Sequence, residues 1–352
     1  MKKLISLIVC VTLFFVGFRI VLNGNYENGE LRIYLPGEYI SDEVIQQFEY
    51  EYSIEVTIDT FESNELMYTK LLTGTSYDIV IPSDYMIERL IKEKMVQKLD
   101  KSKITIWDEL YEGVLNCDFD PNNDYSIPYF WGNGGIVYDS TIVDSDEVES
   151  QGWNILTNTK YKGQIYMYDS IRDIFMIALK QLGYSMNTSD TNELNEAYDW
   201  LCNIAKTMDP AYAADECIDG LAYGEKALGF MYSGDAAYIL SENEDMRFYA
   251  PEIGTNYFTD AMCILNNAQN VENAYLFMNY ITSYDAAYEN SSYVGYASVN
   301  KDVLNDLTLE DADFDGNEAY IPRERNSLDE EFHNDEDTLK VISDLWIRVK
   351  NN

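Results

Sequence analysis

The sequence has few basic residues. In 352 residues, 24 Lys and Arg stand against 62 Asp and Glu, which leaves a formal net charge of −38. Nucleic-acid-binding proteins use basic patches to displace the counterions of the phosphate backbone, so this deficit argues against a nucleic-acid partner. It argues in the same way against an anionic membrane surface. A cationic ligand is the natural expectation, although an acidic surface often serves only to keep a protein soluble.

Histidine and the common catalytic motifs are also scarce. The chain has one histidine, His333, and no G-x-S-x-G, G-x-G-x-x-G, P-loop or H-E-x-x-H motif, which argues against an enzyme that uses a nucleophile and a base. Four cysteines lie far apart without metal-ligand spacing, and we expect buried thiols at Cys117, Cys202, Cys217 and Cys263. We therefore expect no enzymatic activity, no cofactor and no metal. An exported protein could still form a disulfide, whose pairing the sequence does not select.

The amino-terminal residues have the pattern of an export signal. Two lysines precede an apolar run from Leu4 to Leu22, close to the length that spans a bilayer, and no small-x-small cleavage site follows. We expect residues 1–25 to be a signal peptide or an uncleaved membrane anchor, and we prefer the anchor. Cys10 fits a lipidation box poorly because the residue before it is not small. The rest of the chain is then extracytoplasmic.

From residue 30 onward, short β-rich runs alternate with amphipathic segments, which predicts mainly parallel sheets flanked by helices. In the first part, strands are expected at 31–34, 54–58 and 77–81, and helices at 42–48, 63–72 and 84–93, with Ser63 as an N-cap. Further strands are expected at 135–138, 164–168, 227–231 and 257–266, and further helices at 171–182, 191–206, 234–241, 271–283 and 337–349. The length exceeds that of a single core, so two α/β domains are expected.

The residues that follow the predicted strands are candidate ligand contacts, because open parallel sheets bind ligands outside the carboxyl ends of their strands. These positions supply hydroxyls, aromatic rings and carboxylates, but no lysine or histidine; they include Glu38, Tyr39, Ser83, Tyr85, Asp169, Ser170, Asp173, Tyr232, Asp235 and Asp260. A protonated alkyl diamine or triamine needs carboxylates for its ammonium groups and aromatic walls for its methylenes. Aromatic faces also attract ammonium groups, by roughly 0.5 to 2 kcal/mol each.

A hydrolase that uses two carboxyl groups is the alternative class. Asp169 and Asp173 lie four residues apart at a predicted helix start, and two carboxyls about 5 to 9.5 Å apart can hydrolyse a glycosidic bond. With 62 acidic residues, such pairs are expected by chance.

Four segments carry a resemblance to a known family. They are FESNE with MY at residues 61–68, YDIVIPSDY at 77–85, FDPNNDYSIPYFWG at 119–132 and LGYS at 182–185. Together they resemble the polyamine (spermidine/putrescine) substrate-binding proteins of ABC importers, in the type II periplasmic-binding-protein-like class. The resemblance covers nearly everything after residue 30.

This resemblance implies an α/β fold of two lobes, each with a mainly parallel sheet flanked by helices, that close around a hinge. The chain would cross between the lobes near residues 129–132 and near residue 257. Lobe 1 would comprise residues 30–130 plus about 258–305, and lobe 2 residues 131–257. Residues 306–352 would form a C-terminal segment that packs across the lobes.

Position by position, the resemblance places ligand contacts at Tyr39, Ser83, Tyr85, Asp173, Tyr232, Phe258, Asp260, Tyr296 and His333, with Glu38, Asp169 and Ser170 as weaker candidates. Asp260 is expected to bind an inner ammonium group and Asp173 a terminal one, with aromatic rings walling the alkyl chain. Pro36, Tyr232 and Phe258 stand where the family often has Trp, and Ser170 stands where it can have an acid. The choice between spermidine and putrescine therefore stays open.

The function that this resemblance implies is that of an extracytoplasmic, monomeric receptor. It would bind a polyamine, perform no chemistry and deliver the ligand to an ABC permease and its ATPase, while the amino-terminal segment holds it at the membrane. Three alternatives remain: the hydrolase on a similar two-lobed scaffold, the same fold with another small cationic solute, and a sensory rather than a transport role.

Overall fold

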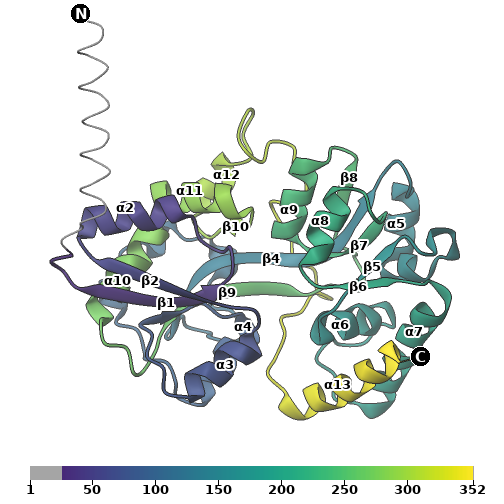
Figure 1. The fold of residues 1–352 in the computed structure, drawn as a ribbon, viewed down its shortest axis with the longest axis horizontal. Coiled ribbons are helices and arrows are strands. Elements are labelled where there is room, and N and C mark those ends of the chain that lie inside the picture. Colours follow the sequence, from purple (N-terminus) through teal and green to yellow (C-terminus); the bar gives the residue numbers. More distant parts are fainter. Residues whose placement is uncertain (1–25, 352) are drawn as a thin grey trace, which may run out of the picture.

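The computed structural model describes residues 26–351, which form one ten-stranded mixed sheet flanked by helices (Figure 1). The strand order is β2-β1-β3-β9-β4-β7-β5-β6, and β8 and β10 also pair with β4. Two halves lie at the two ends of the long strand β4 (Ser126–Asp139), which runs from one into the other. We call them the first half and the second half, in the order in which the chain enters them.

The first half contains the three strands that come first in the chain and two that return late. Its strands are β1 (Glu30–Pro36), β2 (Glu55–Phe61), β3 (Ile79–Val80), β9 (Tyr257–Ile264) and β10 (Ala297–Ser298). Its helices are α2 (Asp42–Tyr52), α3 (Asn64–Leu72), α4 (Asp84–Lys92), α10 (Val271–Ile281), α11 (Tyr284–Val294) and α12 (Lys301–Asp306). Short 3-10 helices cover Lys101–Lys103, Trp107–Glu109 and Glu112–Val114.

The second half is built from one continuous stretch of chain. Its strands are β5 (Ile165–Tyr168), β6 (Ala211–Ala213), β7 (Leu228–Tyr232) and β8 (Met246–Tyr249). Its helices are α5 (Ser145–Gln151), α6 (Ile171–Gln181), α7 (Thr191–Thr207), α8 (Glu216–Ala222) and α9 (Ser233–Glu242), with 3-10 helices at Gly152–Thr157 and Thr159–Tyr161. Helix α13 (Glu336–Lys350) ends the described chain and packs on α6 and α7.

Strand β4 belongs to both halves. It pairs with β9 from Ser126 to Asn133, and from Gly134 onward it pairs with β7 and β8. The outer strands are parallel, as expected, because β1 pairs in parallel with β2 and β3, and β5 with β6 and β7. The ladders that β4 and β9 form with their neighbours are antiparallel. All but the last residue of β4 are buried, which suits a strand covered on both faces.

Local sequence signals explain where the predicted helices begin and which faces they bury. Ser63 caps α3 as predicted, since its hydroxyl accepts a hydrogen bond from the backbone N–H of Leu66 at 3.3 Å. In α2, the apolar residues Val44, Ile45 and Phe48 all face the core. Phe48 is fully buried, and its ring centroid lies 5.2 Å from that of Phe277 in α10.

The chain returns across both halves after α12. Asn317 donates a hydrogen bond to the carbonyl of Ala237 in α9 (2.8 Å), and the N–H of Glu330 donates to the carbonyl of Thr255 (3.1 Å). The N–H of Asn334 then donates to the Glu88 carboxylate in α4 at 2.9 Å. Residues 306–351 therefore contact elements of both halves.

The structure tests the predictions for four cysteines, but not the prediction for the amino-terminal segment. Cys202, Cys217 and Cys263 are buried, whereas Cys117 is only partly buried, and all four are free thiols. In the part of the chain that the structure covers, no helix has the length and apolarity needed to cross a bilayer. The predicted export segment and Cys10 lie outside the described residues.

Candidate ligand-binding site

Asp260 is held at the end of the first-half sheet by two hydroxyl groups. The Tyr39 hydroxyl donates a hydrogen bond to Asp260 Oδ2, and Ser83, which forms a β-bridge with Asp260, bonds to it through its side chain. Burial raises the pKa of Asp260, and these two hydrogen bonds oppose that shift. The second oxygen, Oδ1, is buried without a hydrogen-bond partner. Such an oxygen is an available acceptor for a charged donor.

Asp173 is the matching carboxylate of the second half. It lies in the first turn of α6, and the Tyr232 hydroxyl at the end of β7 donates to its Oδ1 at 2.5 Å. Ser170, which precedes the helix, also bonds to Asp173 through its side chain. Only 3% of Asp173 is exposed, and burial raises its pKa against the effect of these hydrogen bonds. Its place at a helix amino terminus favours the charged form.

Asp235 is a third carboxylate of this kind, and the resemblance did not select it. It lies in the first turn of α9, three residues after β7 ends, and its side chain hydrogen-bonds to Tyr296. Burial raises the pKa of Asp235 to about 7. The ring of Tyr296 lies directly against Gly234, where a Cβ atom would be 2.0 Å from Tyr296 Cδ2. Asp235 was predicted as a candidate ligand contact only because it follows a predicted strand.

Aromatic rings join these three carboxylates into one continuous surface. The ring centroids of Tyr39 and Tyr296 lie 5.5 Å apart, those of Tyr296 and Phe258 5.9 Å, and those of Phe258 and Tyr232 5.2 Å. All three contacts are edge-to-face, a favoured geometry for aromatic pairs. We call these four residues the aromatic strip. It runs from the loop after β1, through the crossing strand β9, to the end of β7, so both halves contribute to it.

Tyr85 does not join the aromatic strip through any ring contact that the structure shows. Its ring lies beneath the guanidinium group of Arg172, whose central carbon is 4.0 Å from the ring centroid. Its hydroxyl lies 3.3 Å from Glu65 Oε1, and its ring meets Phe332 edge-on at 6.4 Å. Tyr85 therefore contacts a cation of the protein itself.

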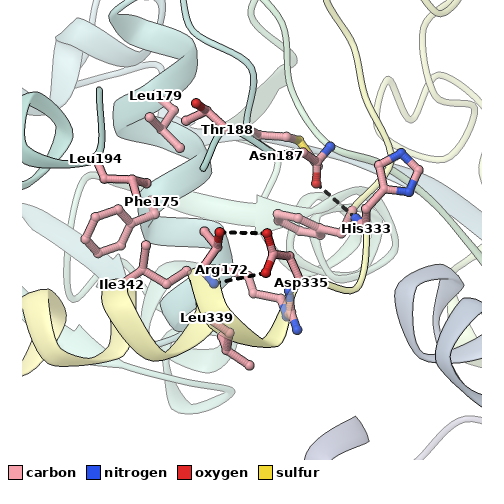
Figure 2. Close-up of a pocket in the computed structure, with 13 residues that line it drawn as sticks. Arg172, Phe175, Leu179, Asn187, Thr188, Leu194, His333, Asp335, Leu339 and Ile342 are labelled. Carbon is pink, nitrogen blue, oxygen red and sulfur yellow. Dashed lines mark hydrogen bonds between the residues drawn. The ribbon is translucent and has the colours of Figure 1, made fainter. Parts of the chain in front are cut away.

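His333, which the resemblance implied as a ligand contact, borders a pocket that Arg172 also lines. Its side chain is 45% exposed, and its Nδ1 lies 3.5 Å from Glu88 Oε2. The pocket is small, about 40 Å³, and is lined by α6, the start of α7, residues 186–188, α13 and the chain that leads into α13. Figure 2 shows His333 at this pocket, with its backbone N–H bonded to Asn187 at 2.9 Å. The structure therefore does not bring His333 to the aromatic strip.

Two weaker candidates, Asp169 and Glu38, have different surroundings from the three carboxylates. Asp169 accepts hydrogen bonds from Trp346 Nε1 and Lys350 Nζ in α13, both at 3.0 Å, so a charge of the C-terminal helix neutralises it. Glu38 is exposed in the turn after β1, with a φ of 52°. Asp169 and Asp173 therefore engage different partners, since Asp169 bonds to α13 and Asp173 to Tyr232. Among residues 26–351, no cluster of three or more His, Cys, Asp or Glu is placed to hold a metal ion.

Two halves joined by crossing strands, with carboxylates and aromatic rings from both sides, define a solute-binding protein. The chain belongs to the bacterial extracellular solute-binding protein family, whose model matches residues 43–317. It is 36% identical over 293 residues to the spermidine/putrescine-binding periplasmic protein of Escherichia coli K12. The matched region covers 80% of this chain and 83% of that protein. It is 31% identical over 273 residues to the putrescine-binding periplasmic protein SpuD of Pseudomonas aeruginosa. That match covers 72% of this chain and 74% of SpuD.

Solved structures show the same likeness. The substrate-binding protein PotD of a spermidine/putrescine ABC transporter from Streptococcus pneumoniae matches with a TM-score of 0.80 and 36% identity, over 92% of this chain and 99% of that chain. A putative spermidine/putrescine ABC transporter protein from Listeria monocytogenes matches with a TM-score of 0.79 and 33% identity, over 91% and 98%. The resemblance predicted from the four sequence segments is thereby confirmed, as is the two-lobed α/β fold class.

Proposed function

We propose that this protein binds a polyamine, spermidine or putrescine, between its two halves and delivers it to an ABC permease. The observation that carries the proposal is the set of three buried or partly buried carboxylates, each hydrogen-bonded by a tyrosine, along one aromatic strip: Asp173, Asp235 and Asp260. Carboxylates at intervals along an apolar wall match ammonium groups at intervals along an alkyl chain. The names of the relatives support the same ligand class.

We further propose that the two halves are lobes that close around the ligand. Lobe 1 would span residues 30–130 with about 258–305, lobe 2 residues 131–257, and residues 306–352 would pack across both. Support comes from the change of partner along β4, where the pairing passes from β9 to β7 and β8 after Asn133. Hinge closure about a few crossing segments is a common response of two-lobed proteins to a ligand.

We propose the remaining partners and the location from the same family relationship. The receptor would act as a monomer outside the cytoplasm, with residues 1–25 as its membrane anchor and an ABC permease with its ATPase as the next component. It would perform no chemistry. Relatives named as periplasmic binding proteins support the extracytoplasmic location.

Isothermal calorimetry on the full-length protein tests the ligand. We expect heat of binding with putrescine and spermidine, and much weaker binding of N-acetylputrescine, which lacks one ammonium group. Glutamate serves as a control of opposite charge. The absence of both heat and a thermal shift at millimolar putrescine and spermidine would refute the proposal.

A further inference from the structure

Arg172 places a positive charge of the protein beside the proposed ligand site. It precedes Asp173 in α6, in the second half, while its side chain reaches the first half. There its guanidinium carbon lies 4.0 Å from the ring centroid of Tyr85, and its Nη2 lies 3.6 Å from Glu65 Oε1. Only 13% of the Arg172 side chain is exposed.

The surroundings of Arg172 have the same chemistry as the three tyrosine-bonded carboxylates. Tyr85 supplies an aromatic face, and its hydroxyl lies 3.3 Å from the Glu65 carboxylate. Asp84 adds a buried carboxylate whose Oδ2 has no hydrogen-bond partner. Burial raises the pKa of Asp84 and of Asp173, and the positive charge of Arg172 opposes both shifts. An aromatic ring with a neighbouring carboxylate is the feature that attracts an ammonium group elsewhere in the site.

We propose that Arg172 occupies a fourth cation position, formed by Tyr85 and Glu65, and thereby limits the length of the polyamine that the site accepts. The proposal rests on the proposed function. A guanidinium group and a ligand ammonium cannot share one ring face and one carboxylate, because two like charges about 4 Å apart repel each other. Specificity often depends on such a repulsive element as much as on attractive contacts.

The aromatic strip and Tyr85 would therefore bind different cations. The ligand has Asp173, Asp235 and Asp260 with the aromatic strip, while Tyr85 serves the protein's own cation. On this proposal, an additional ammonium group on a longer polyamine would find Tyr85 and Glu65 already occupied by Arg172. Removing the charge of Arg172 opens that position to the ligand.

The test compares putrescine, spermidine and spermine, which carry two, three and four amines, by calorimetry on full-length wild type and variants. In Arg172→Gln, we expect the affinity for spermine relative to that for putrescine to rise at least fivefold. Arg172→Met keeps the packing on Tyr85 without the charge. We expect the same rise in the affinity for spermine relative to putrescine. This second variant tests the proposal if Arg172→Gln does not fold. Arg172→Lys keeps a cation and should stay within about twofold of the wild-type ratio.

Arg89→Gln is the matched control. Its guanidinium carbon lies 3.6 Å from the ring centroid of Tyr68, and it pairs with Glu93 at 3.0 Å, so the variant removes an equivalent arginine, ring and carboxylate contact. It also breaks the 2.5 Å pair between Arg89 and Glu336 in α13, so it tests the loss of a contact to that helix as well. We expect it to leave the spermine-to-putrescine ratio unchanged. An equal rise in this control would show that net charge alone sets the ratio, and would overturn the proposal.

Two other outcomes overturn it as well. An unchanged ratio in both Arg172→Gln and Arg172→Met would refute the limit on length. An equal loss of affinity for all three amines would show that Arg172 only holds the halves together. Wild-type protein that binds none of the amines would refute the proposed function instead.

Discussion

The Tyr39 hydroxyl donates a hydrogen bond to Asp260 Oδ2 across 221 positions of sequence. Tyr39 follows β1, and Asp260 lies in β9, one of the strands on which the chain crosses between the halves. This bond fixes one carboxylate oxygen and leaves the other, Oδ1, buried without a partner. The geometry of a ligand contact is therefore set before any ligand arrives, which reduces the cost of ordering on binding.

Asp260→Asn should weaken polyamine binding about 10- to 100-fold. The variant removes a charge-assisted hydrogen bond to the ligand, and such a bond contributes about 1.5 to 3 kcal/mol. The free energy of unfolding should not fall at pH 7, because the variant removes a buried charge whose pKa burial raises. Calorimetry and urea denaturation measure the two effects. Asp285→Asn, on the exposed start of α11, is the control and should change neither.

Stability should decline with rising pH because of Asp235. Its pKa is about 7 in the folded protein and about 3.9 in an unfolded chain. Between these values the folded state binds more protons than the unfolded state, so this group's contribution to stability falls as the pH rises through that window. Asp235→Asn should remove that decline in urea denaturation at pH 5, 6, 7 and 8. Parallel curves for the variant and the wild type would contradict the role of Asp235.

Polyamine binding should release protons at pH 7. A ligand ammonium group favours the charged form of Asp235, so its pKa falls on binding and the fraction that was protonated loses its proton. Calorimetry in buffers with different ionisation enthalpies counts the protons, and Asp235→Asn should release fewer. An equal number in both proteins would locate the release elsewhere.

Gly234→Ala should disrupt Tyr296. The added Cβ would lie 2.0 Å from Cδ2 and 2.3 Å from Cγ of that ring, so the ring must move and its contact with Asp235 is lost. We expect at least a tenfold loss of affinity, and a loss of about 1 to 3 kcal/mol in the free energy of unfolding, as for other overpacked sites. Gly37→Ala, where a Cβ would meet nothing within 4 Å, should cost little.

Arg323→Gln should destabilise the crossing C-terminal segment. Arg323 donates two hydrogen bonds of 2.8 Å to Asp329, whose side chain is fully buried, and removing one partner of such a pair costs about 3 kcal/mol. Urea denaturation measures the loss, and the double variant with Asp329→Asn should regain part of it. Lys340→Gln breaks an exposed pair with Asp337 and should stay within about 0.5 kcal/mol of wild type.

Much of the fold could be predicted from local sequence because the signals are local. Apolar spacing and caps predicted α2, α3, α6 and α7 within a few residues of their observed bounds. Strands β6, β8 and β10 were not predicted, since two to four residues carry little periodicity and their partners are distant in sequence. The long β4 exceeded its expected range because its first part pairs with β9 in the other half.

The site follows the same division between local and distant information. Tyr39, Asp173 and Asp260 were predicted from their places near strand ends and from the resemblance, and the structure places them along the aromatic strip. Asp169 and His333 remain untested predictions: the structure pairs Asp169 with Lys350, 181 positions away, and places His333 next to Glu88 and Asn187. Arg172 escaped notice because the search followed acidic and aromatic residues, whereas only the packed structure shows its charge over Tyr85.

The position of β9 in the sheet dictates an order of assembly during synthesis. Strand β3 pairs with β1 on one side and with β9 on the other, yet nearly 180 residues of chain separate β3 from β9. Until β9 is made, β3 presents an unpaired edge, and such edges promote aggregation. The second half, which needs only continuous chain, can complete its strands earlier. The first half begins to be synthesised before the second half, yet its sheet is completed later. Until then the exposed edge of β3 is where a chaperone would need to act.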